Sequence, residues 1–228
     1  MIPLLATIIP LGLAAAIRPS LFATQLLIVG QPNWWPRARA LAVGASLPLL
    51  VFGLLVFFGF NQLPKVPVGE LNILGVSIRT ILGVIFLAAS VWLLRSHPKL
   101  EQRSAEYLRD KVAHGTARDF FLFGFVMNGK SVTSYALLLP ALHDIAAAAD
   151  PLPFRLLGLL LLYVLAFSTL WLPMGLALVS GRRGGTTLSR LSDFVIERNF
   201  TILGVMMLLV GLYLTGSAAL LVALFERL

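Results

Sequence analysis

The sequence predicts an all-α membrane protein of six transmembrane helices, arranged as two inverted three-helix repeats with helices 1 and 4 broken near the bilayer midplane. Three observations predict this fold class. Of the 228 residues, 58% are apolar and only 12% are charged, whereas a soluble domain has about a quarter charged residues. Six stretches are long and apolar enough to cross a hydrocarbon core, which takes about 20 residues. Two of them are interrupted by polar residues at matching places. The composition excludes an ordinary soluble domain and a disordered chain.

The apolar stretches follow one another along the whole chain. Their approximate bounds are Ile2–Val29, Ala40–Phe60, Leu71–Leu94, Phe120–Leu142, Leu156–Val179 and Phe200–Phe225. We expect the first to be a true span and not a signal peptide, because no Lys or Arg precedes Arg18 and because Pro3 and Pro10 interrupt its apolar run. Pro48 and Pro173 suggest kinks in the second and fifth stretches.

Basic residues gather at one end of the predicted helices. Twelve lie at the first end: Arg37, Arg39, Arg95, Lys99, Arg103, Arg109, Lys111, Arg118, Arg182, Arg183, Arg190 and Arg198. Four lie at the other: Lys65, Arg79, Arg155 and Arg227. Cytoplasmic loops collect Lys and Arg, so we expect a multi-pass protein of the cytoplasmic (inner) membrane with both termini outside. The same bias explains the net charge of +8 without nucleic acid as a partner.

The chain divides into two predicted halves joined by a polar segment. Residues 1–96 form the first three-helix repeat, residues 97–118 a cytoplasmic basic linker, and residues 119–228 the second repeat. An odd number of helices in each half places the two copies in opposite orientations. The linker is either an amphipathic helix on the inner surface or a solvated segment, and the sequence leaves both open.

Two local alignments support the duplication. Gly12 through Arg18-Pro19 aligns without a gap with Gly124 through Lys130-Ser131, near the middle of helices 1 and 4. Thr80-Ile-Leu-Gly-Val in helix 3 matches Thr201-Ile-Leu-Gly-Val in helix 6. These matches are short, and they fall where the duplication predicts them.

Two cations lie inside the predicted spans without an acidic partner there. Arg18 is about 16 residues into the first stretch and Lys130 about 10 into the fourth, so both should lie near the bilayer centre. A lone cation at that depth costs at least about 2.5–3.5 kcal/mol. Pro19 opens helix 1, and Asn128-Gly129 loosens helix 4. These features predict a site for an anionic ligand between the repeats. The alternative is that both cations bind backbone carbonyls and hold the broken helices together.

The predicted site combines the two cations with neighbouring polar groups and freed backbone groups. Its substrate-binding residues are Arg18, Pro19, Ser20, Thr24, Gln25, Asn128, Gly129, Lys130, Ser131, Thr133 and Ser134. The chain has no cysteine, its three histidines lack metal-ligand spacing, and no nucleotide-binding motif is present. Without an interior base or nucleophile, the sequence predicts no enzyme, no catalytic residue, no metal and no cofactor.

Two segments resemble a known family. LGLAAAIRPSLFATQLLIVGQPNWWPRARALAVG resembles the opening of the sulfolipid- and glycopeptidolipid-addressing proteins, a branch of the lysine-exporter transporter superfamily, and FGFVMNGKSVTSYALLLPAL resembles their second repeat. Asn128 and Lys130 match the Asn-Pro-Lys-Asn motif that breaks helix 4 of the family, while Gly129 and Ser131 replace its Pro and second Asn. Arg18 occupies a position that is usually small or polar. The resemblance implies two inverted three-helix repeats and movement of polar cell-envelope lipids.

The sequence therefore predicts a transporter or flippase that moves an anionic polar lipid, of glycolipid or phospholipid type, across the cytoplasmic membrane toward the cell envelope. Its predicted partners are membrane lipids, with the anionic head group as substrate. One alternative is a non-transporting accessory or scaffold subunit of a larger lipid-export or envelope-biosynthesis complex, with an exporter or synthase as partner. Another is an exporter of a small anionic or amino-acid-like solute. Gly204 and Gly211 allow close packing inside the chain or in a homo-oligomer.

Overall fold

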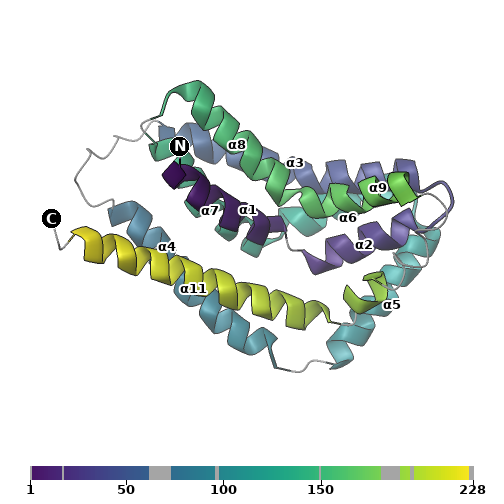
Figure 1. The fold of residues 1–228 in the computed structure, drawn as a ribbon. Coiled ribbons are helices and arrows are strands. Elements are labelled where there is room, and N and C mark those ends of the chain that lie inside the picture. The colour runs from purple at the N-terminus through teal and green to yellow at the C-terminus, as the bar shows by residue number, and fades with distance from the viewer. Residues whose placement is uncertain are drawn as a thin grey trace.

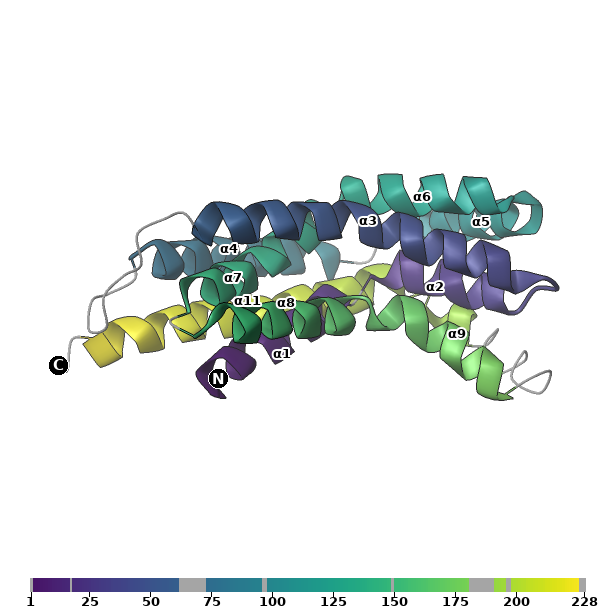
Figure 2. The ribbon, with the colours of Figure 1, turned by 90° about the horizontal axis from the view of Figure 1, so that it is seen from above.

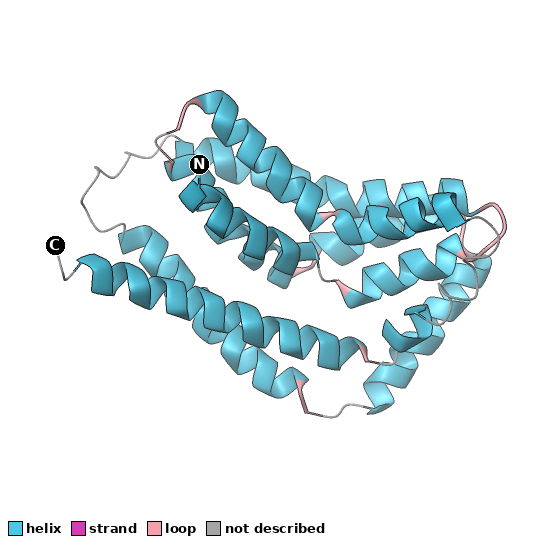
Figure 3. Ribbon diagram, viewed as in Figure 1, coloured by secondary structure: helices cyan, strands magenta, loops and turns pink. Residues whose placement is uncertain are grey.

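The computed structural model describes residues 2–16, 18–61, 73–95, 98–148, 150–180, 191–195 and 198–225, and these residues are almost entirely helical (Figure 3). The main helices are α1 (Ile2–Ala16), α2 (Pro19–Val29), α3 (Trp34–Asn61), α4 (Ile73–Leu93), α5 (Pro98–His114), α6 (Ala117–Gly129), α7 (Val132–Ala147), α8 (Leu152–Ala166), α9 (Ser168–Ser180) and α11 (Asn199–Phe225). The predicted all-α class is confirmed over the described residues.

The helices fit a multi-pass membrane protein with three to five candidate spans. Trp34–Gly59, Gly75–Leu93 and Phe200–Ala223 are each long and apolar enough to cross a membrane alone. Two bent pairs pass the same test jointly: α1 with α2, bent by 62°, and α8 with α9, bent by 63°. The fourth predicted stretch, Phe120–Leu142, is divided between α6 and α7 and is not among these candidates. Six complete spans are therefore not observed.

Local chemistry accounts for two of the breaks between helices. Pro19 begins α2, because its missing N–H and fixed φ suit the first turn of a helix. Ser131 caps α7, its Oγ accepting a hydrogen bond from the backbone N–H of Ser134 at 3.4 Å. The fifth stretch breaks at Phe167, between α8 and α9, whereas Pro173 lies inside α9 and Pro48 inside the continuous α3. Pro173 therefore does not mark the break in the fifth stretch, and Pro48 does not break the second one.

Helices α4 and α11 form a pair that lies beside the other helices (Figures 1 and 2). A Cβ added to Gly83 would lie 2.6 Å from Cγ2 of Thr215, and one added to Gly211 would lie 2.8 Å from Cγ of Leu87. Gly204 of α11 also faces α4, at the side chain of Leu94. Gly204 and Gly211 of α11 thus pack against other residues of the same chain.

A second close crossing joins α3 to α6. A Cβ on Gly44 would lie 2.1 Å from the carbonyl oxygen of Phe121, and one on Gly124 would lie 2.7 Å from the carbonyl oxygen of Leu41. The two backbones therefore approach each other where neither helix carries a side chain. This crossing fixes the end of α6, where Asn128 donates a hydrogen bond from Nδ2 to the carbonyl oxygen of Ala45.

The two termini lie toward one end of the molecule, and α5 lies toward the other end with the turn that precedes α3 (Figure 1). Arg37 and Arg39 belong to the first turns of α3, and Arg109 and Lys111 belong to α5. These four basic residues therefore lie away from the termini, and the side of the membrane that each end faces stays a prediction. Five of the basic residues counted in the sequence lie outside the described residues: Lys65, Arg182, Arg183, Arg190 and Arg227.

Helix α5 occupies most of the predicted linker. Leu108 and Val112 are buried against the other helices, while Nη2 of Arg109 lies 2.8 Å from Oδ1 of Asp193 on the exposed side. The segment is thus an amphipathic helix in the structure, attached to the bundle by its apolar face.

A capping box begins α6, directly after α5. Oγ1 and the backbone N–H of Thr116 donate hydrogen bonds to Oδ2 of Asp119 at 2.7 and 2.9 Å, and Oγ1 accepts one from the Asp119 N–H at 3.4 Å. The hydrogen bond from the Thr116 side chain is the main reason that the pKa of Asp119 lies below its ordinary value; the backbone N–H of Thr116 lowers it further.

The capping box should stabilise the protein at neutral pH and fail in acid. Because the folded pKa of Asp119 lies below the unfolded one, its contribution is complete above about pH 4 and is lost as the pH falls through the lowered pKa. Thermal unfolding of the wild type and of Asp119→Asn across this range measures the effect. We expect the wild type to be more stable at neutral pH and the difference to shrink in acid; a difference independent of pH would contradict this assignment.

Candidate anion-binding site between the broken helices

A cavity of about 310 Å³ lies where the α1–α2 break faces the α6–α7 break, with α11 along its side. Its lining residues are Ala15, Arg18, Pro19, Ser20, Leu21, Met127, Asn128, Ser131, Thr133, Ser134, Leu137, Phe200 and Leu203. Most of the predicted site residues are in this lining. The structure thus brings together two segments that are more than a hundred residues apart in the sequence.

Arg18 gives the cavity its charge. It is the only ionisable residue in the described part of the lining, and all three of its guanidinium nitrogens are buried without a hydrogen-bond partner in the structure. Its Cζ lies 5.7 Å from the ring centroid of Phe167, at the break between α8 and α9, a weaker contact than a salt bridge. A buried charge without a paired anion carries a penalty of several kcal/mol, so this side of the cavity favours a negatively charged ligand.

Hydroxyl groups and helix N-termini add to this polarity. Oγ of Ser131 lies 2.8 Å from Oγ of Ser134 at the start of α7, and Ser20 and Thr133 line the same cavity. The first turn of α2 also lies in the lining, and no side chain caps it. The N-terminus of a helix carries a partial positive charge and unsatisfied N–H groups that bind anions. Together with the planar fork of Arg18, these groups suit phosphate, sulfate or carboxylate.

Asn128 takes part in both packing and the cavity. Its amide is buried, with Nδ2 bonded to the carbonyl oxygen of Ala45, while Oδ1 has no hydrogen-bond partner among the described residues. The residue lies directly before the α6–α7 break and lines the cavity. The hydrogen bond to α3 thus holds this side chain in place at the cavity. Its Oδ1 is available to a ligand or a water molecule.

Lys130 and Gly129 lie outside the cavity lining and are exposed. Lys130 occupies the C-cap position of α6, and its side chain is exposed. The structure therefore brings one of the two predicted cations to the cavity. An alignment of the two breaks cannot predict the direction in which each side chain leaves the helix.

Thr24 and Gln25 also lie outside the lining, one turn or more beyond Ser20. Oγ1 of Thr24 donates a hydrogen bond of 2.7 Å to the carbonyl oxygen of Ser20 within α2. Nε2 of Gln25 donates to the carbonyl oxygens of Ala38 in α3 and Leu170 in α9, at 3.2 and 3.0 Å. Gln25 therefore joins three helices and has a packing role in this structure.

Replacing Gln25 with leucine should lower the thermal stability and leave anion binding unchanged. The substitution removes two buried hydrogen bonds, each of which contributes about 0.5–1.5 kcal/mol. Thermal unfolding in detergent and retention of anionic lipid measure the two effects separately. Loss of lipid with unchanged stability would instead place Gln25 in the binding site.

Three residues of the site were not predicted from the sequence: Phe167, Phe200 and Leu203. Phe167 comes from the unpredicted α8–α9 break, and the other two belong to α11, whose apolar residues look alike before packing is known. Within the described residues, no three His, Cys, Asp or Glu side chains lie close enough to hold a metal ion. The described lining combines the guanidinium of Arg18 with several hydroxyl groups, which are the groups that bind anions.

The apolar helices fit a multi-pass membrane protein, and its broken helices line a cavity that contains the buried guanidinium of Arg18. A family model described as Sap, sulfolipid-1-addressing protein, matches residues 8–220. The chain belongs to this family, as its two motif segments predicted. Comparison with curated proteins and with solved structures gave no match. Placement in the wider lysine-exporter superfamily stays a prediction.

Proposed function

We propose that this protein moves an anionic polar lipid across the cytoplasmic membrane, with the lipid head group held in the Arg18 cavity. The lipid-addressing description of the family supports a lipid substrate. The buried guanidinium of Arg18 has no hydrogen-bond partner among the described residues, which supports a negative charge on the lipid head group, and this is the single observation that carries the proposal. Phosphate and sulfate are the head-group anions that its fork suits best.

The dimensions of the cavity support binding of a head group and not of a whole lipid. A volume of about 310 Å³ lies at the lower end of small-molecule sites. Met127 lines the cavity and is 41% exposed, and Val132, which follows the lining residue Ser131, is 78% exposed. The acyl chains would therefore stay against this apolar outer surface while the head group enters between the helices.

Reciprocal contacts support the inverted repeat. Gly83 of α4 lies against Thr215 of α11, and Gly204 of α11 lies against Leu94, the residue directly after α4. Gly204 follows Gly83 in the sequence by the same interval at which Thr215 follows Leu94. Contacts that exchange in this way are expected when two copies of one unit pack around a pseudo-twofold axis in the membrane plane.

The first and fourth predicted spans, which begin with α1 and α6, show the same exchange of contacts between the two halves. Gly124 of α6 packs against Leu41 and the backbone of Ala45 in α3, the second helix of the first half. Gly12 of α1, its aligned partner, packs against Leu162 and Leu165 in α8, the second helix of the other half. These contacts support a site shared by two related halves, in which rocking of one half against the other would carry the head group across.

Mass spectrometry of co-purified lipids tests the proposal. Wild type, Arg18→Met and Lys130→Gln are purified in parallel, and Lys130 serves as the matched control because it aligns with Arg18 but lies outside the cavity. We expect an anionic lipid on the wild type and on Lys130→Gln, and its loss from Arg18→Met. Identical lipids on all three proteins would contradict the site and favour an accessory subunit. Stabilisation by inorganic phosphate without retained lipid would indicate a water-soluble anion.

A further inference from the structure

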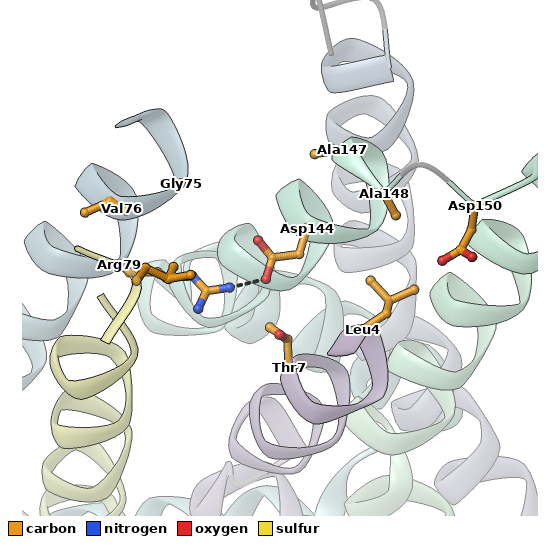
Figure 4. Close-up of a pocket in the computed structure, with 10 residues that line it drawn as sticks. Leu4, Thr7, Gly75, Val76, Arg79, Asp144, Ala147, Ala148 and Asp150 are labelled. Atoms are coloured by element: carbon orange, nitrogen blue, oxygen red, sulfur yellow. Dashed lines mark hydrogen bonds and ion pairs between the residues drawn. The ribbon is translucent and has the colours of Figure 1, made fainter. Parts of the chain in front are cut away.

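A second cavity, of about 480 Å³, lies at the terminal end of the molecule (Figure 4). Helices α1 and α7 contribute to it, as they do to the Arg18 cavity, and the pair α4–α11 supplies its other wall. Both cavities therefore lie along one seam, defined here as the contact between the α4–α11 pair and helices α1 and α7. Arg79 of α4 and Asp144 of α7 face each other across the seam in this second cavity.

The same helix faces connect the two cavities. Ala14, Phe86 and Leu137 line a narrow space on the seam, and Leu137 also lines the Arg18 cavity. Each of these three residues is seven positions from a residue that lines the second cavity, which corresponds to about two helical turns, or about 10 Å, on one face. The residues at that end are Thr7, Arg79 and Asp144. A short apolar zone thus separates the two cavities along one path.

Polar contacts close the seam at the terminal end. Nη2 of Arg79 is bonded to Oδ2 of Asp144 in an ion pair whose side chains are 10% and 20% exposed. The hydroxyl of Tyr213 in α11 donates a hydrogen bond of 3.1 Å to the carbonyl oxygen of Ala6 in α1. These contacts tie α4 to α7 and α11 to α1 at the end opposite to the Arg18 cavity.

We infer that Arg79 is a second, low-affinity site for the anionic head group, and that its ion pair with Asp144 closes the release end of the path until a head group competes for Arg79. This inference rests on the proposed function, since it concerns the same lipid at a later point of its movement. The guanidinium of Arg79 presents the same fork to phosphate or sulfate as Arg18. A head group that reached it would displace the carboxylate of Asp144.

The surroundings of the pair suit exchange and release. His143 is buried beside the pair, with Nδ1 3.5 Å from Oδ1 of Asp144. The carboxylate of Asp144 therefore keeps a polar contact when Arg79 binds a head group instead. The carboxylates of Asp144 and Asp150 both line the second cavity, whereas no acidic residue is in the described lining of the Arg18 cavity. An anion is therefore held less tightly at Arg79 than at Arg18, which favours its departure.

Spin-label distances across the seam test the closure. The chain has no cysteine, so Ser77→Cys in α4 and Ala147→Cys in α7, both exposed, can be labelled without a background signal. The distance distribution is measured in phosphatidylcholine nanodiscs. We expect Asp144→Asn to shift it to longer distances, the exchanged pair Arg79→Asp/Asp144→Arg to restore the wild-type distribution, and Asp110→Asn, an exposed control on α5, to leave it unchanged. An unchanged distribution in Asp144→Asn, with the protein folded, would overturn the inference.

Addition of phosphatidylglycerol tests the competition. We expect it to move part of the wild-type population to the longer distances seen in Asp144→Asn, and to have no such effect in Arg18→Met. If Arg18→Met loses its lipid but Asp144→Asn shows no shift, the proposed function stands and the closure by Arg79 and Asp144 is wrong. If Asp144→Asn opens the seam but lipid retention does not depend on Arg18, the closure by Arg79 and Asp144 stands and the proposed head-group site at Arg18 is wrong.

Discussion

Arg18→Met should make the lipid-free protein more thermostable and at the same time abolish its stabilisation by anionic lipid. The guanidinium is buried without a hydrogen-bond partner in the described structure, and an unpaired buried charge costs several kcal/mol. Methionine fills similar space without that cost. The variant should gain a few degrees in melting temperature, and its affinity for an anionic head group should fall by at least about tenfold, or about 1.4 kcal/mol.

The unfolding in this experiment is measured by tryptophan fluorescence, because the chain has four tryptophans. Thermal unfolding in detergent is recorded at rising concentrations of phosphatidylglycerol and, separately, of phosphatidylcholine. Arg39→Met is the matched control, because Arg39 is an exposed arginine at the ring of Trp35 and should give neither effect. A lower melting temperature for lipid-free Arg18→Met would show that Arg18 holds the broken helices together, the structural alternative to substrate binding.

Gly44→Ala should strongly destabilise the protein. The added Cβ would lie 2.1 Å from the carbonyl oxygen of Phe121, a distance that no side-chain rotation can relieve, so α3 and α6 would have to separate. Overpacking of this kind costs about 1–3 kcal/mol and sometimes more. The separation would also disturb Asn128, which reaches Ala45 across the same crossing, so lipid retention should fall with stability.

Gly59→Ala provides the control within the same helix. Nothing lies within 4 Å of a Cβ at Gly59, and alanine favours a helix by about 1 kcal/mol over glycine. Melting temperatures of the two variants should therefore move in opposite directions from the wild type. Equal stability of Gly44→Ala and the wild type would mean that α3 and α6 do not cross as closely as the structure has them.

Local chemistry predicted the helix breaks that form the site. Pro19 lacks the N–H that a continuous helix requires, and Asn128-Gly129 is a weak helix former, so both breaks could be placed from the sequence. The cost of a cation inside an apolar span selected Arg18 in the same way. Where a residue's own chemistry conflicts with its surroundings, the sequence is informative.

The remaining features depend on which surfaces meet, and a single sequence does not contain that information. Lys130 satisfies the same rule as Arg18, yet its side chain leaves α6 at an exposed position. Asp144 lies just beyond the fourth apolar stretch of the sequence, and only the packing of α4 against α7 gives it Arg79 as a partner. The break at Phe167 lies in a sequence of ordinary helix formers. Packing between helices decides all three cases.

Movement of labelled lipid between leaflets tests the central claim most directly. Wild type, Arg18→Met and Lys130→Gln are reconstituted into vesicles with acyl-chain-labelled phosphatidylglycerol or phosphatidylcholine, and an external quencher follows the label that reaches the outer leaflet. The account predicts that the wild type and Lys130→Gln accelerate movement of phosphatidylglycerol well above that of phosphatidylcholine, and that Arg18→Met does not. Equal movement of the two lipids, or undiminished movement with Arg18→Met, would contradict it.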